Sequence, residues 1–198
     1  SGADWPSRIV TLAHKLRTAF ASSPLREGPF RLFYFGTIGA ALGYTMQTTV
    51  SSWLMATLTP SALMVALVQT SSTLPALLFG LIAGSVSDIA DRRRVILVSV
   101  VVMVITVAVL GLAALAGLIG PVALLALTFL VGCGFTFFMP AQLASTSELV
   151  SRAELPQAVA LGAIAFNVAR AVGPALAGAI AAWVGTGSAL LASALAFT

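Results

Sequence analysis

Arg170 is the residue best able to bind a charged partner, because it lies well inside a long apolar stretch that begins near residue 157. At 1.5 Å per residue of helix, it would lie about 20 Å from the start of that stretch. A charge at such a depth in a bilayer must face protein, water or a substrate. Asn167 comes three residues earlier and shares its helix face. The pair indicates a cavity for an anionic or carbonyl-rich substrate. A buried ion pair, or capping of broken-helix carbonyls, explains Arg170 equally well.

A second group of residues that could do chemistry is a cluster of charges between two apolar stretches. Its glycine would let helices pack closely at the membrane edge, and its aspartates could face a helix N-terminus or a basic partner. Its arginines would bind anionic lipid head groups. The cluster predicts a tight turn held by ionic contacts, a gating latch made of Gly84, Asp88, Asp91, Arg92, Arg93 and Arg94. Simple anchoring of a cytoplasmic loop explains the charges equally well.

A third group predicts a bend in the stretch that carries Arg170. Pro174 removes a backbone hydrogen bond, and the glycines on either side, Gly173 and Gly178, would let a neighbouring helix approach. A kink that serves only packing is the alternative. Tyr44 and Gln47 are weaker candidates for a substrate cavity, since the hydroxyl residues around them usually bond to their own backbone.

Several functions are excluded by what the sequence lacks. With one cysteine, Cys133, and one histidine, His14, we expect neither a disulfide framework nor a metal site. No nucleophile, base and orienting group occur together, so an enzyme is not expected, and no cofactor is predicted. The basic residues are few and lie where lipid head groups would be, which argues against nucleic-acid binding. No acid lies at membrane depth, so any proton coupling would need an acid elsewhere in the protein.

The elements that position these residues follow from composition and charge. Of 198 residues, 59% are hydrophobic and 8% are charged, whereas soluble domains carry about 25% charged residues. The chain is therefore predicted to be an all-α, multi-pass membrane protein. Two uncharged runs, 32–87 and 95–147, are each long enough to cross a bilayer twice. Turn residues divide the apolar stretches into expected helices at 32–57, 62–86, 95–117, 121–143, 157–184 and 188–198.

The last of these stretches is too short to cross a bilayer, so we expect the chain to be a fragment with an incomplete sixth helix. Every lysine and arginine apart from Arg170 falls on one side of this topology, which predicts that this side and the N-terminus are cytoplasmic. Residues 1–29 form the expected cytoplasmic tail. Within it, apolar residues at helical spacing over 6–20 predict an amphipathic interfacial helix, with a solvated leader as the alternative.

The latch segment resembles a signature of the major facilitator superfamily, Gly-x-Leu-Ala-Asp-Arg-x-Gly-Arg-Arg. Gly84, Asp88, Arg92 and Arg93 occupy matching positions, whereas Ile89 and Asp91 depart from it. Both departures are similar to the transmembrane secretion effector branch, whose members resemble the enterobactin exporter. Further matching segments are Met46-Gln47, Trp53-Leu54-Met55, Leu58-Thr59-Pro60-Ser61, Pro140-Ala141-Gln142 and the run from Asn167 to Gly178. That run resembles the Gly-Pro-x-x-Gly-Gly signature of exporters, with Ala177 in place of one glycine.

This resemblance implies the N-terminal six-helix bundle of a twelve-helix transporter, over residues 30–198, built from two inverted three-helix repeats. The recurrence of Pro-Ala-Leu at Pro75 and Pro174 agrees with such repeats. The missing C-terminal half would be the partner, and the lipid bilayer and a small-molecule substrate would be the other contacts. The implied function is export of a drug-like or siderophore-like molecule across a bacterial inner membrane by alternating access. A non-transporting assembly or sensory subunit is the alternative.

Overall fold

The computed structural model describes residue 24 and residues 28–198, and the latter form six α-helices. The tail helix predicted over 6–20, together with His14, lies outside the described residues. The helices are α2 (Gly28–Leu58), α3 (Ala62–Ile89), α4 (Arg92–Leu115), α5 (Pro121–Leu149), α6 (Leu155–Val184) and α7 (Thr186–Ala196). The predicted all-α class is confirmed.

The charged segments are more helical than the sequence suggested. We placed Arg92, Arg93 and Arg94 in a loop, but they form the first turn of α4. The helix can start there because the Asp91 side chain accepts hydrogen bonds from the backbone N–H groups of Arg93 and Arg94, at 2.9 and 3.4 Å. Likewise, α5 continues to Leu149 instead of ending near residue 143.

Polar residues do not end α5, because their hydroxyl groups bond within the helix. Ser145 donates to the Ala141 carbonyl at 2.8 Å, and Thr146 donates to the Gln142 carbonyl at 3.0 Å. Glu148 therefore lies in the last turn of α5, and Asp88 lies in the last turn of α3, beyond the helix ends predicted at residues 143 and 86.

Helices α3, α4, α5 and α6 have the length and hydropathy of membrane spans, and α7 is a shorter apolar helix. Many large apolar side chains point out of the bundle. Leu77, Leu81 and Trp183 are 82%, 91% and 88% exposed. A surface of this kind is stable against lipid or another protein surface but not against water. The chain is an integral membrane protein.

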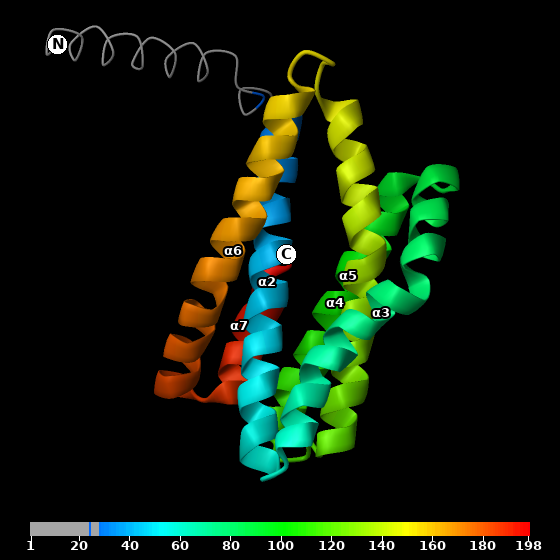
Figure 1. The fold of residues 1–198 in the computed structure, drawn as a ribbon. Helices are drawn as coiled ribbons and strands as arrows, with labels where there is room; N and C mark the ends of the chain where they lie inside the picture. The colour runs from blue at the N-terminus through cyan, green and yellow to red at the C-terminus, as the bar shows by residue number, and fades with distance from the viewer. Residues whose placement is uncertain (1–23, 25–27) are drawn as a thin grey trace, which may run out of the picture.

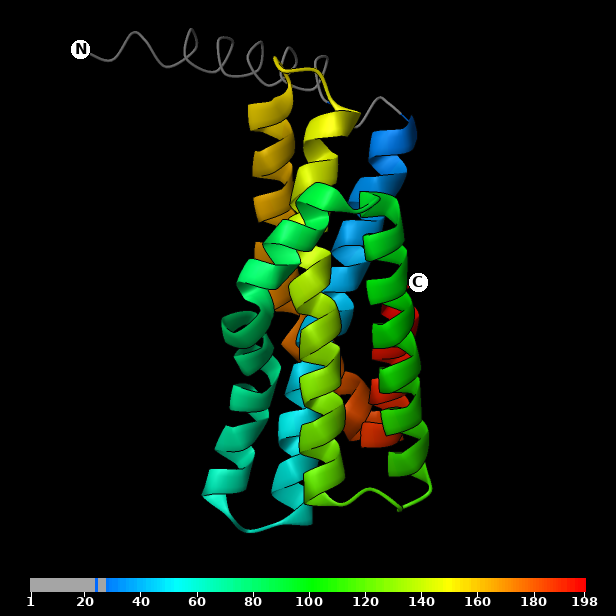
Figure 2. The same cartoon turned by 90° about the vertical axis from the view of Figure 1, so that its right-hand side faces the viewer.

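The helices pack as two inverted repeats, α2–α4 and α5–α7. Helix α2 packs against α6 and α7, whereas α5 packs against α3 and α4. Helix α4 also packs against α7, and α2 against α5. Exchanging the two repeats leaves this pattern unchanged, so α3 and α6 are equivalent, and Figure 1 shows them on opposite sides of the bundle. In Figure 2, α7 lies behind α4, and the two helices are in contact.

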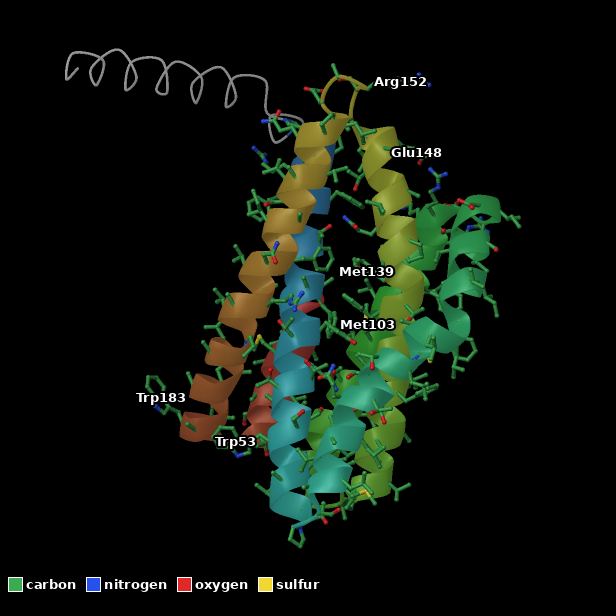
Figure 3. The ribbon with its side chains drawn as sticks, viewed as in Figure 1. Trp53, Met103, Met139, Glu148, Arg152 and Trp183 are labelled. Carbon is green, nitrogen blue, oxygen red and sulfur yellow. The ribbon has the colours of Figure 1, made fainter. Side chains whose placement is uncertain are left out.

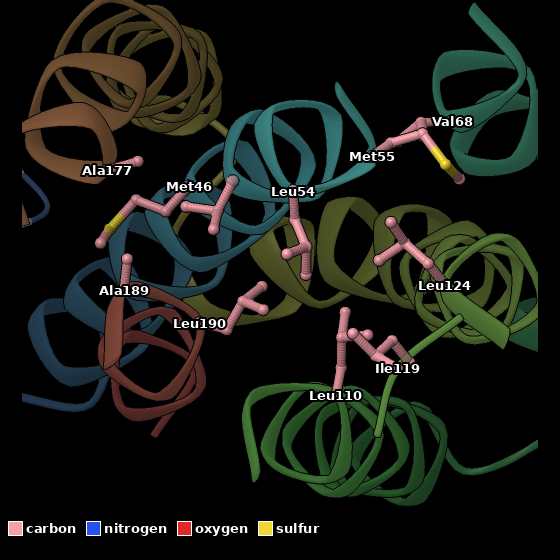
Figure 4. Close-up of a cluster of buried hydrophobic side chains, with 11 residues drawn as sticks. Met46, Leu54, Met55, Val68, Leu110, Ile119, Leu124, Ala177, Ala189 and Leu190 are labelled. Carbon is pink, nitrogen blue, oxygen red and sulfur yellow. The ribbon is translucent and has the colours of Figure 1, made fainter. Parts of the chain in front are cut away.

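Two apolar clusters fill the interior. One joins α2, α3, α4, α5, α6 and α7 near the α2–α3 and α4–α5 turns, with Leu54, Leu110, Leu124 and Leu190 at its centre (Figure 4). The other surrounds Met103 and Val131, nearer the middle of the bundle. These clusters fix how the helices face one another and therefore which polar side chains point inward.

Charges divide the bundle into two different ends. The charged end carries the start of α2 and the α3–α4 and α5–α6 turns, with Glu148 and Arg152 visible there in Figure 3. The uncharged end carries the other three turns, and Trp53 and Trp183 lie towards it. Among the described residues, Arg170 is the one charge away from the charged end.

Candidate functional site

The latch residues lie at the charged end, where Arg92 holds three helices together. Its guanidinium pairs with the carboxylate of Glu148 on α5. It also donates to the Ala144 carbonyl at 3.4 Å and to the Ser87 carbonyl at 3.3 Å. Arg92 thereby ties the start of α4 to the ends of α3 and α5.

The other latch residues form fewer contacts with neighbouring helices. Asp91 caps α4 and lies 3.6 Å from the Arg94 guanidinium. Asp88 and Arg93 are exposed, and neither forms an ion pair with another described residue. A Cβ added at Gly84 would meet nothing within 4 Å among the described residues, so no close helix approach is found there. Asp88, Arg93 and Gly84 thus leave a surface that another part of the protein can contact.

We predict that the Arg92–Glu148 pair stabilises the charged end only modestly. Their side chains are 28% and 64% exposed, and partly solvated pairs contribute about 1 kcal/mol or less to the free energy of unfolding. A double-mutant cycle with Arg92→Gln and Glu148→Gln, measured by unfolding in detergent, should show coupling of that size. Arg93→Gln is the control, because Arg93 has no described ion partner. Equal coupling of Arg93 and Arg92 to Glu148 would contradict the prediction.

A cavity of about 940 Å³ opens at the latch, between the ends of α2, α3, α4 and α5. Its walls are apolar at Phe33, Ile96 and Leu149 and charged at Asp91 and Arg93. None of the predicted substrate-cavity residues, Arg170, Asn167, Gln47 or Tyr44, lines it.

Tyr44 lies at a crossing of four helices. Its hydroxyl donates to the Ser72 carbonyl of α3 at 3.0 Å, and its ring stacks on Phe135 of α5 with ring centroids 3.9 Å apart. The rings of Phe135 and Phe166 of α6 are arranged edge to face, with centroids 6.4 Å apart. We call Tyr44, Phe135 and Phe166 the aromatic row. It connects α2, α5 and α6 through polarisable rings, which suit flat apolar molecules.

Gln47 points into the bundle interior rather than towards the aromatic row. It is fully buried, its amide donates to the Ser51 hydroxyl at 2.9 Å, and it lies 3.5 Å from the Thr128 hydroxyl of α5. Its carbonyl oxygen has no hydrogen-bond partner within the part of the chain that the structure describes. Gln47 therefore bridges α2 and α5 and does not open onto a surface.

Arg170 and Asn167 both lie on the exposed side of α6. The Asn167 amide donates to the Ala163 carbonyl of its own helix at 2.9 Å, whereas Arg170 forms no ion pair with a described residue. Arg170 follows Phe166 by four residues, so it lies one helical turn along the same face. Arg170 thus lies on the next turn of α6 from the aromatic row, and a guanidinium can donate several hydrogen bonds.

The predicted bend in α6 contains two glycines with different surroundings. A Cβ at Gly173 would overlap the Thr45 hydroxyl of α2, so only glycine lets the helices approach this closely. A Cβ at Gly178 would meet nothing within 4 Å. Pro174 lies inside α6 directly after Gly173.

Sequence reasoning missed Thr45, Phe135 and Phe166. The two phenylalanines are large rings in mostly aliphatic helices, a signal that could have found them. Thr45 could not be singled out in this way, because Thr48 and Thr49 in the same helix are residues of the same type. Among the described residues, no group of His, Cys, Asp and Glu could hold a metal ion.

A protein family and a multidrug efflux pump are similar in sequence to this chain. The sequence profile described as transmembrane secretion effector matches residues 18–198. The chain is 30% identical over 166 residues to the multidrug efflux pump Tap of Mycolicibacterium fortuitum, an alignment that covers 81% of this chain. The chain spans about 40% of the length of that relative. No solved structure matches the chain.

Proposed function

Because this chain belongs to the transmembrane secretion effector family of the major facilitator superfamily, we propose that it forms the N-terminal bundle of an exporter of small organic molecules. Membership of this family makes it part of a transporter and not an enzyme. The observation that supports a substrate site is Arg170, an exposed guanidinium in the middle of α6, one turn from the aromatic row.

The substrate class follows from the chemistry of this face. Tyr44, Phe135 and Phe166 offer stacking surfaces, and Arg170 offers donors to carbonyl, carboxylate or phosphate oxygens. A flat, apolar molecule with at least one such acceptor would satisfy both. The name of the related multidrug pump agrees with substrates of this drug-like kind.

Transport would proceed by rocking of this bundle against a second bundle. The exposed apolar faces of α3 and α6 would contact that second bundle, with the substrate held near the membrane midplane between the two. The described acids all lie at the charged end, so a residue for proton coupling would belong to the second bundle. The charged end, which holds Arg31, Arg92–Arg94 and Arg152, would face the cytoplasm of a bacterial cell.

Dye export from vesicles tests the proposal. The full-length protein, reconstituted in lipid vesicles, should move an aromatic fluorescent dye with an acceptor group when an ion gradient is applied. Vesicles that lack the protein and vesicles without a gradient serve as controls. If a panel of such dyes shows no gradient-dependent movement, the exporter proposal fails and a non-transporting membrane subunit takes its place.

We predict that Asp88→Asn slows this transport several-fold while leaving dye binding at equilibrium nearly unchanged. Asp88 has no described ion partner, so it can pair with a basic residue of the second bundle in one conformation and set the rate of exchange. Glu154→Gln is the matched control, because Glu154 accepts its hydrogen bonds from Ser151 in its own turn. Loss of dye binding with normal exchange would count against a gating role.

A further inference from the structure

Two consecutive side chains of α2 form hydrogen bonds with two helices that contain a proline, α3 and α6. The Tyr44 hydroxyl donates to the Ser72 carbonyl of α3 at 3.0 Å, three residues before Pro75. The Thr45 hydroxyl lies 3.0 Å from the Ala169 carbonyl of α6, five residues before Pro174. One turn of α2 therefore contacts both flanking helices close to their prolines.

Both contacts lie where the flanking helix can bend most easily. Pro75 has no N–H to offer to the Ser71 carbonyl, and Pro174 has none for the Arg170 carbonyl. The carbonyls that α2 binds, those of Ser72 and Ala169, adjoin these two breaks. A change in bend would move each bound carbonyl relative to α2.

The two contacts differ in what happens when they break. The Thr45 hydroxyl also lies 3.0 Å from the Ala41 carbonyl and 3.1 Å from the Leu42 carbonyl of its own helix. Its single proton can therefore leave α6 and return to α2 without leaving the hydroxyl unpaired. The Tyr44 hydroxyl has the Ser72 carbonyl as its acceptor among the described residues, and its ring is held by Phe135.

We propose that Thr45 is a positioning residue that holds α6 near Pro174 and releases it during transport, whereas Tyr44 keeps α3 fixed to α2. Gly173 makes the hold possible, because a side chain there would displace the Thr45 hydroxyl from Ala169. The importance for transport rests on the proposed function. The contact between α2 and α6 is seen in the structure and does not depend on that function.

The competing explanation is that Thr45 bonds only to its own helix. Neighbouring residues do so: Thr49 donates to the Thr45 carbonyl at 2.8 Å, and Ser52 donates to the Thr48 carbonyl at 3.0 Å. Thr49 is thus a matched control one turn away. On this explanation, Thr45→Val and Thr49→Val would have the same effects.

A distance measurement tests the hold directly. Cysteines that carry spin labels replace Trp53 of α2 and Trp183 of α6. Both positions are exposed and lie between the Thr45–Ala169 contact and the uncharged end (Figure 3). Cys133 is first changed to alanine, and the full-length protein is placed in lipid vesicles. Thr45→Val should broaden and shift the distance distribution, whereas Thr45→Ser and Thr49→Val should match the parent. An unchanged distribution for Thr45→Val overturns the proposal.

Transport gives the second readout. In Thr45→Val, we expect the maximal dye export rate to change about three- to tenfold, the effect of one interhelical hydrogen bond in a membrane. The dye concentration for half-maximal rate should stay unchanged, and Thr45→Ser should restore the rate. Equal rates for Thr45→Val and Thr49→Val overturn the role in transport. If the parent moves no dye, the proposed function fails, while the distances still decide whether Thr45 holds α6.

Discussion

Gly173→Ala is expected to lower the free energy of unfolding by about 1–3 kcal/mol, the usual cost of forcing an extra carbon into a close-packed interior. The new Cβ would overlap the Thr45 hydroxyl and lie 3.0 Å from the Thr45 Cβ. Either α6 moves away from α2 or Thr45 leaves its rotamer, and both responses break the contact with Ala169. Unfolding of the detergent-solubilised protein, followed by helical circular dichroism, measures the loss.

Gly162→Ala on the same helix is the matched control. A Cβ there meets nothing within 4 Å, so the substitution should be neutral or should raise stability by up to about 1 kcal/mol through lower chain entropy in the unfolded state. If both variants lose the same stability, the destabilisation comes from α6 in general and not from its contact with Thr45.

This comparison separates residues that the sequence grouped together. Gly173, Pro174 and Gly178 were predicted as one hinge because they share a motif. In the structure, Gly173 is buried against α2, whereas Gly178 contacts nothing within 4 Å at its Cβ position. Motif membership therefore could not distinguish a glycine needed for packing in this bundle from one that faces outward. The role of all three as a hinge stays a prediction.

The family, the all-α membrane fold and the transporter class could be predicted from the sequence and are confirmed. Motif resemblance indicated the family and the transporter class, whereas charge placement indicated the membrane fold, because charged residues are excluded from apolar spans. The same signal misplaced the helix ends. Arg92 and Glu148 can belong to helices, since a helix end at the membrane surface accommodates charge when a cap such as Asp91 is present.

Which way a side chain points could not be predicted. A helix that is apolar all round has no periodic signal to separate its buried face from its outer face. Gln47 and Tyr44 were therefore given the same role, yet Gln47 is fully buried between α2 and α5, while Tyr44 joins the aromatic row. Thr45 was missed for the same reason, because its contact with Ala169 depends on how α2 and α6 pack.

Arg170→Gln should reduce dye export by about tenfold or more, since losing a charged partner of a desolvated group costs about 2 kcal/mol or more. The expected defect is in substrate affinity, because Arg170 lies one turn of α6 from the aromatic row and has no described ion partner. Arg170→Lys should recover part of the activity, as a lysine keeps the charge but not the planar donor geometry. Export from vesicles over a range of dye concentrations measures both effects.

Two controls decide what the loss means. Arg152→Gln removes a charge at the exposed α5–α6 turn and should leave export unchanged. A dye that lacks hydrogen-bond acceptors should be exported equally well by the parent and by Arg170→Gln if Arg170 binds substrate. If export of both dyes falls equally, Arg170 acts through structure instead, as an ion pair with an acid of the second bundle. In that case, exchanging the arginine and its acid should restore transport, a rescue that a substrate-binding residue would not show.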